Sequence, residues 1–148
     1  MGLALEEAKR ACALGEVPIG AIIVDGEGQV VSVGFNRRET WHDATAHAEL
    51  IAVRNACAKL ERWRLADTTL YVTVEPCPMC AGALVMARVK SLVYGAPDFK
   101  AGAVESLFNI ADNPALNHRL EITAGIRADE CSALMKSFFA ARRCKGKK

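Results

Sequence analysis

The chain has 148 residues, and we expect one domain with a substantial core and no room for a second. Apolar residues make up 51% of it, yet no apolar run is long enough to cross a bilayer, which argues against a membrane protein. The net charge of +2 is uneven: six basic and no acidic residues follow from Lys136 onward, against 13 basic and 17 acidic before it. A cationic end on an acidic body fits polyanion binding and a solvated terminus equally well.

The N-terminal residues indicate a cytoplasmic protein, and this bears on how the cysteines are interpreted. Residues 1–14 show helical periodicity, whereas a secretory leader needs a basic start and a long apolar block. Without secretion a disulfide scaffold is not expected. Four cysteines lie singly on helical patterns, where a thiol packs as a small apolar side chain: these are Cys12, Cys57, Cys131 and Cys144.

The hydrophobic pattern predicts a mixed sheet with helices packed on it. The expected elements are a helix over 1–14, strands over 19–25 and 30–35 joined by a hairpin turn, a polar loop over 36–44, a helix from the 45–50 segment to about Lys59, a strand over 68–74, a helix over 78–88, a strand over 91–96, a short helix near 104–108, a short strand over 120–123 and a last helix from about Asp129. The 68–96 region is a βαβ unit, which pairs two parallel strands through a right-handed crossover.

The segment VEPCPMCAG, residues 74–82, predicts a metal-binding turn. A residue before proline is kept out of the helical region, and proline itself suits the first helical position. Cys77 is therefore expected at the N-cap of the following helix and Cys80 at its third position, two places whose side chains meet. The helix dipole and free N–H groups there favour thiolates. The pair suits a soft divalent metal, most simply zinc.

The segment TAHAEL, residues 45–50, supplies the rest of the predicted site. His47 is the expected third ligand because it begins a helix after a loop, whereas His42 and His118 lie within loops. Three protein ligands leave a fourth position for water, as in catalytic zinc sites. Glu49 is then an unligated carboxylate placed to move protons. Alone, a Pro-Cys-x-x-Cys also fits a redox or structural-zinc site; with His-x-Glu it indicates a catalytic centre.

His-x-Glu followed by Pro-Cys-x-x-Cys is the signature of zinc-dependent nucleobase deaminases. From about Ala4 to Arg143 the chain resembles the bacterial tRNA-specific adenosine deaminases. The similar segments are EVPIGAIIV, GFNRRE, HDATAHAELIA, TLYVTVEPCPMCAGAL, NHRLEIT and ADECSALMKSFFAARR. The resemblance implies a single deaminase domain over 1–148 with a cytidine-deaminase-like, three-layer α/β/α fold and a mixed five-stranded sheet. It also implies a homodimer with one Zn²⁺ per subunit that converts adenosine to inosine at the wobble position of a tRNA anticodon.

Carried over by position, the resemblance implies roles for individual residues. The zinc ligands are His47, Cys77 and Cys80, with Glu49 as the proton shuttle. The residues around the target nucleoside are Asn36, the Ala48 backbone and the region of Val17. The residues expected to contact the anticodon stem-loop are Asp98, Lys100, His118, Arg119, Phe139, Arg142 and Arg143.

Other functions stay open at this point. A deaminase of a free base or nucleoside, of the guanine or cytosine type, shares the motif, although the cationic last helix favours RNA. Free cytidine deaminases usually have Cys-x-Glu where this chain has His-Ala-Glu. A non-catalytic, zinc-stabilised RNA-binding module would need a fourth protein ligand and no Glu49. A catalytically silent subunit is disfavoured by the complete ligand set.

Overall fold

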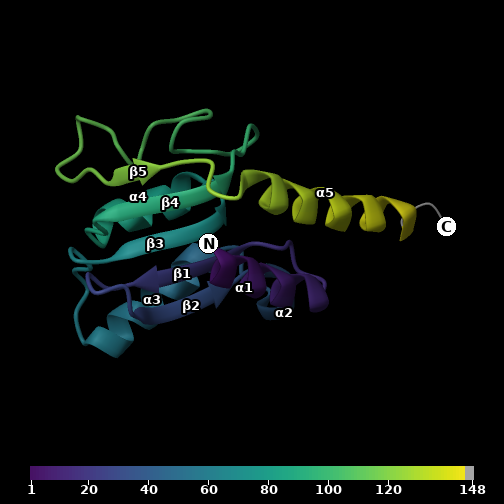
Figure 1. Ribbon diagram of the computed structural model, residues 1–148, viewed down its shortest axis with the longest axis horizontal. Helices are drawn as coiled ribbons and strands as arrows, with labels where there is room; N and C mark the ends of the chain where they lie inside the picture. The colour runs from purple at the N-terminus through teal and green to yellow at the C-terminus, as the bar shows by residue number, and fades with distance from the viewer. Residues whose placement is uncertain (146–148) are drawn as a thin grey trace.

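The computed structural model describes residues 1–145, so Lys147 and Lys148 of the basic terminus lie outside the described residues. A five-stranded sheet with the order β2-β1-β3-β4-β5 forms its centre (Figure 1). The strands are β1 (Gly20–Val24), β2 (Val30–Phe35), β3 (Thr69–Val74), β4 (Ser91–Ala96) and β5 (Glu121–Thr123). The helices are α1 (Gly2–Ala13), α2 (Arg38–Trp41), α3 (Ala48–Leu60), α4 (Pro78–Met86) and α5 (Ala128–Lys145).

Strand directions bring most of the expected site residues to one end of the sheet. β1 is antiparallel to both β2 and β3, whereas β3, β4 and β5 run parallel, which confirms the mixed sheet and the βαβ unit. As a result β2, β3 and β4 all finish at the same end, on the right in Figure 1. We call this the cluster end, after the group formed there by His47, Cys77 and Cys80, and we call the opposite end of the sheet the far end.

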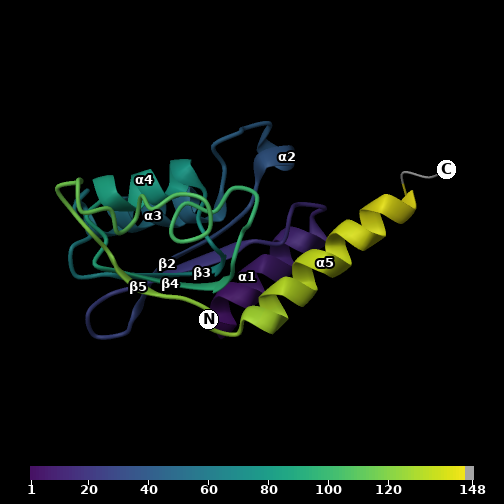
Figure 2. The same ribbon diagram turned by 90° about the horizontal axis from the view of Figure 1, so that it is seen from above.

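Helices cover both faces of the sheet, which confirms the three-layer α/β/α architecture. α3 and α4 lie on one face, and α1 and α5 lie side by side on the other (Figure 2). Two glycines allow close packing: a Cβ on Gly34 would lie 2.3 Å from the Ala48 carbonyl oxygen, and one on Gly20 only 2.1 Å from that of Ala4. α3 therefore starts directly against the end of β2, which fixes the position of its N-terminus.

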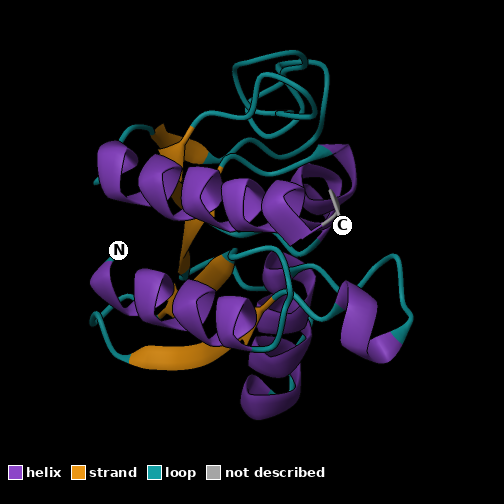
Figure 3. Cartoon of the chain, turned by 90° about the vertical axis from the view of Figure 1, so that its right-hand side faces the viewer, coloured by secondary structure: helices purple, strands orange, loops and turns teal. Residues whose placement is uncertain are grey.

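α5 continues past the cluster end, which Figure 3 views face on. Its first turns pack on β4 and β3, with Cys131 buried against Gly95. Further along, the Arg142 guanidinium donates a hydrogen bond of 2.9 Å to the Gly15 carbonyl oxygen. Cys144 is exposed, so its expected place in the core is wrong. Among residues 1–145 no helix combines the length and apolar character needed to cross a membrane.

Two predictions of local structure, the loop over 36–44 and the short helix near 104–108, are wrong for the same physical reason. Residues 38–41 form the short helix α2, because the buried Glu16 carboxylate accepts N–H bonds at its first turn. The helix expected near 104–108 is a series of turns instead. There the Glu75 carboxylate accepts the backbone N–H groups of residues 104, 105 and 106. In both loops a carboxylate distant in sequence decides the backbone conformation.

Candidate metal centre

Three side chains of ligand type converge at the cluster end. His47 Nδ1 lies 3.6 Å from Cys77 Sγ and 3.5 Å from Cys80 Sγ. The ligand atoms of all three lie within 4.8 Å of one another, and no other such group of His, Cys, Asp or Glu occurs within the described chain. The structure thus brings together the three residues that the sequence singled out as metal ligands. His42 and His118, the alternatives, are not part of the group.

The ends of two helices supply these ligands. His47 is the N-cap of α3, in an extended conformation with φ −80° and ψ 150°. Cys77 is the N-cap of α4, Pro78 holds the first helical position, and Cys80 follows at the third, fully buried. The proline geometry expected from the sequence therefore places both sulfur atoms at the open end of α4. Two helix N-termini face one cluster, where their dipoles favour thiolate.

The cysteine thiols differ in their affinity for protons. A hydrogen bond from Cys80 lowers the pKa of Cys77 to about 4, and the same bond raises the pKa of Cys80. Hydrogen bonding to Cys77 also raises the pKa of His47, against the effect of burial. A divalent ion would displace these protons, because it binds thiolate and neutral imidazole. Two sulfur donors and one nitrogen donor suit zinc, with a fourth position left for a non-protein ligand.

Glu49 lies next to the cluster without belonging to the ligand group. It is the second residue of α3 and only 3% exposed, and within residues 1–145 its Oε2 atom has no hydrogen-bond partner. Burial raises the pKa of Glu49 to about 7. A buried carboxyl oxygen without a partner is costly, and natural proteins keep such groups where they act. A carboxyl that titrates near neutral pH suits proton transfer.

The residues expected around the substrate lie at the same end. Asn36 follows β2 directly, is only 3% exposed, and accepts a hydrogen bond of 3.0 Å from the Ala48 N–H at the start of α3. Val17 is half-buried just before β1, where its carbonyl oxygen accepts the Ile19 N–H at 2.8 Å. Asn36 is thus tied to the helix turn that carries His47 and Glu49.

Two buried glutamates, which the sequence analysis did not single out, hold the loops on either side of the cluster. Glu16 accepts hydrogen bonds from the N–H groups of Glu39 and Thr40, at the start of α2. Glu75 accepts hydrogen bonds from residues 98–106, the loop that follows β4. Burial by itself raises the pKa of Glu75, but these hydrogen bonds outweigh it and lower the pKa to about 2. The one available signal was position, since Glu75 lies in the metal-binding turn, two residues before Cys77.

The residues expected to contact RNA divide between the two ends. Asp98 and Lys100 lie in the loop after β4, at the cluster end. Phe139, Arg142 and Arg143 lie on the part of α5 that extends past this end, with Phe139 40% exposed. The loop after β4 and the last turns of α5 thus both lie at the cluster end.

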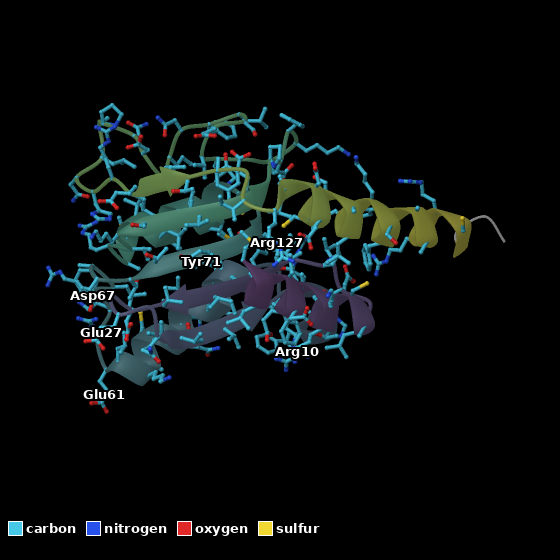
Figure 4. All side chains as sticks on the ribbon, in the orientation of Figure 1. Arg10, Glu27, Glu61, Asp67, Tyr71 and Arg127 are labelled. Atoms are coloured by element: carbon cyan, nitrogen blue, oxygen red, sulfur yellow. The ribbon has the colours of Figure 1, made fainter. Side chains whose placement is uncertain are left out.

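His118 and Arg119 lie at the far end instead, just before β5. The His118 Nε2–H donates to the Val89 carbonyl oxygen at 2.7 Å, beyond the C-terminus of α4. Arg119 Nε donates to Asp112 at 2.7 Å. Within one chain the structure therefore does not bring these two residues to the cluster. Acidic side chains also lie at the far end, where Figure 4 labels Glu27, Glu61 and Asp67.

Comparisons with known proteins identify the family. The family model of the MafB19-like deaminases matches residues 1–143. A tRNA-specific adenosine deaminase of Haemophilus influenzae is 48% identical over 143 residues, which cover 97% of this chain and 83% of the relative. A solved structure from work on A-to-I editing by tRNA:A34 deaminases at the wobble position of transfer RNA superposes with a TM-score of 0.86 at 43% identity, covering 90% of this chain and 96% of the other.

A more distant relative has a different substrate. The guanine deaminase of Nitrosomonas europaea is 28% identical with a TM-score of 0.77, and the match covers 94% of this chain and 82% of the other. The higher identity and the closer superposition both lie with the tRNA enzymes. The chain therefore belongs to the MafB19-like deaminases and to the family of the tRNA-specific adenosine deaminases.

Proposed function

We propose that this protein converts adenosine to inosine at the wobble position of a tRNA anticodon. One zinc ion per subunit would be held by His47, Cys77 and Cys80. The observation that carries the proposal is the buried Glu49 carboxyl, with one oxygen unpaired among the described residues, beside a three-ligand cluster in a chain of this family. Three protein ligands with a separate carboxylate fit a catalytic metal centre, whereas a structural site would have four ligands.

Glu49 carries the protons of the reaction. When bound, zinc acidifies the water that becomes the nucleophile. Glu49 takes a proton from the attacking water while the oxygen of that water bonds to C6 of adenine. Glu49 delivers this proton to N1. Glu49 takes up the remaining proton of the oxygen now bonded to C6 and donates it to the exocyclic amine, the C6–N bond breaks, and ammonia and inosine leave. Because burial raises the pKa of Glu49 to about 7, the carboxyl both accepts and releases protons near neutral pH.

The base is held by groups at the start of α3. Asn36 Oδ1 already accepts the Ala48 N–H, so its side-chain nitrogen is the group it offers to the nucleoside. Val17 forms a wall of the pocket. The target base must leave its stack, which costs a few kcal/mol and is cheapest in a single-stranded loop. An anticodon loop meets this requirement.

Selectivity for RNA would come from the surfaces around the cluster end. Asp98 and Lys100 contact the loop from one side, and the basic part of α5, with Arg142, Arg143 and Phe139, contacts it from the other. Cationic side chains neutralise phosphates, and an exposed aromatic ring offers a stacking surface. We further propose that the chain forms one deaminase domain, acts as a homodimer and works in the cytoplasm, where tRNA is modified.

An assay with four substrates tests this function. The zinc-loaded protein is incubated with an anticodon stem-loop carrying adenosine at the wobble position, and with free adenosine, guanine and cytosine. Inosine is expected in the stem-loop alone. The control is the same stem-loop with adenosine moved one position away, which should stay unmodified. Deamination of guanine or another free substrate, without activity on the stem-loop, would refute the proposal and favour a free-base deaminase.

A further inference from the structure

Glu75 makes an unusual number of hydrogen bonds for a single side chain. It is only 3% exposed, at the exit of β3. Its Oε1 atom accepts three backbone N–H groups, from Val104 at 3.1 Å, Glu105 at 2.8 Å and Ser106 at 2.9 Å. Its Oε2 atom accepts the Asp98 N–H at 3.0 Å and the Ser106 hydroxyl. All the partners lie in the segment 98–106, which we call the anchored loop.

The anchored loop is wrapped tightly around this carboxylate. A Cβ on Gly102 would lie 2.5 Å from the Glu75 carboxyl carbon, so only glycine fits there without a shift. The Gly102 N–H donates to the Asp98 carbonyl oxygen, and the Ala103 N–H donates to the Pro76 carbonyl oxygen, each at 2.8 Å. The loop has no helix or strand of its own. Glu75 and Pro76 therefore provide much of what fixes its conformation.

This contact connects the metal centre to the surface expected to bind RNA. Glu75 is two residues before Cys77, on the same turn. Asp98 is held directly by Glu75, and Asp98 Oδ1 accepts the N–H of Lys100 at 2.9 Å and of Ala101 at 3.2 Å. A continuous path of hydrogen bonds thus runs from the metal-binding turn to Lys100.

We infer that Glu75 is a positioning residue: its carboxylate fixes the anchored loop relative to the metal-binding turn and so sets where Asp98 and Lys100 meet the RNA. This inference rests on the proposed tRNA deaminase function. Glu75 is not part of the metal-ligand group, and both of its carboxylate oxygens are bound by the anchored loop, so it acts through the loop. Its loss is expected to weaken substrate binding and leave the chemical step intact.

The test compares Glu75→Gln with Glu16→Gln. Both variants change a buried loop-holding carboxylate to an amide, but Glu16 holds the loop on the other side of the cluster. An amide has one acceptor oxygen, so in Glu75→Gln either the three N–H groups or Asp98 lose their partner. The measurements are KM and kcat on the anticodon stem-loop, zinc content, and amide hydrogen exchange of residues 98 and 104–106.

For Glu75→Gln, KM is expected to rise about tenfold, since a hydrogen bond to a charged group contributes enough for such a factor. The value of kcat per bound zinc should stay within about twofold, and the amides of the anchored loop should exchange faster while those of β3 do not. Glu16→Gln should leave exchange in the anchored loop unchanged. A fall in kcat and zinc content at constant KM would show a merely structural role and overturn the inference, as would unchanged exchange.

Ser106→Ala removes only the hydroxyl contact to Glu75. It is the variant that tests the inference if Glu75→Gln does not fold. It should raise KM about threefold, and an unchanged KM would overturn the inference. Failure of the proposed function has a separate signature, because the wild-type protein would then not deaminate the stem-loop. An active wild type whose KM is insensitive to both substitutions refutes the positioning role alone.

Discussion

The two ends of the sheet share the same strands and differ in how their polar groups are satisfied. At the far end His118 and Arg119 are each paired within the chain, to the Val89 carbonyl oxygen and to Asp112. At the cluster end Glu49 is buried with an unpaired oxygen, next to three ligand atoms that face one another. Crevices beyond the carboxyl ends of strands are the usual ligand sites of such folds. Among the described residues, a buried carboxyl oxygen without a protein partner thus distinguishes the site from a polar surface.

Substituting matched residues at the two ends tests this difference. The metal ligand His47 gives the largest expected effect. His47→Ala removes one of three ligands and should lose bound zinc and all deamination. His118→Ala should keep both and lose about 1 kcal/mol of stability, because one hydrogen bond is removed. Metal analysis, the stem-loop assay and denaturant unfolding measure these outcomes. Full zinc occupancy in His47→Ala would remove this histidine from the site.

The proton shuttle gives the next largest effect. Glu49→Gln keeps the shape of the side chain but removes its ability to carry protons, so kcat should fall by a factor of about 100 or more. Zinc content should stay at the wild-type level, because Glu49 is outside the ligand group. The control is Glu121→Gln at the far end, where the carboxylate accepts a hydrogen bond from Ser91. Near-normal activity in Glu49→Gln would contradict the assigned role, and loss of zinc would make Glu49 a ligand.

Lysines at the two ends test where the RNA lies. Lys100 and Lys90 are both exposed, on the anchored loop and at the far end respectively. Lys100→Ala should weaken stem-loop binding. It should also reduce the magnitude of the slope of log K against log salt by about 1, because one phosphate contact is lost. Lys90→Ala should change neither quantity. Arg119→Ala is the sharper control, because the family resemblance assigns it to the RNA surface. A salt-dependence slope of smaller magnitude in Arg119→Ala would show that RNA reaches the far end of a protomer.

The predictability of each part of the site follows from how far apart its interacting residues are in the sequence. Cys77 and Cys80 were predictable because Pro78 fixes the local backbone, and His47 because it begins a helix. α2 and the anchored loop were not, since their N–H groups bind carboxylates more than 20 residues earlier in the chain. No local pattern records such a partner. The same holds for His118, whose partner Val89 lies 29 residues away.

The smallest expected effect is on stability at acid pH, through Glu16. Burial alone raises the pKa of this carboxyl, but hydrogen bonds from the Thr40 and Glu39 amides outweigh it and hold the pKa below its ordinary value of 4.5. In the unfolded chain Glu16 takes up its proton near pH 4.5, and in the folded chain only at lower pH. The resulting stabilisation is therefore complete above pH 4.5 and is lost as the pH falls below it.

Unfolding free energies measured from pH 7 down to pH 3 isolate this contribution. Protonation of the metal-binding side chains destabilises every variant in acid. The informative quantity is therefore the difference in unfolding free energy between wild type and Glu16→Gln. That difference should be largest near neutral pH and shrink below pH 4.5. A constant difference across the range would mean that the Glu16 contacts do not depend on its charge. The α2 loop would then be held at the cluster end by packing. The Glu16 contacts would resemble those of Glu75 in geometry alone.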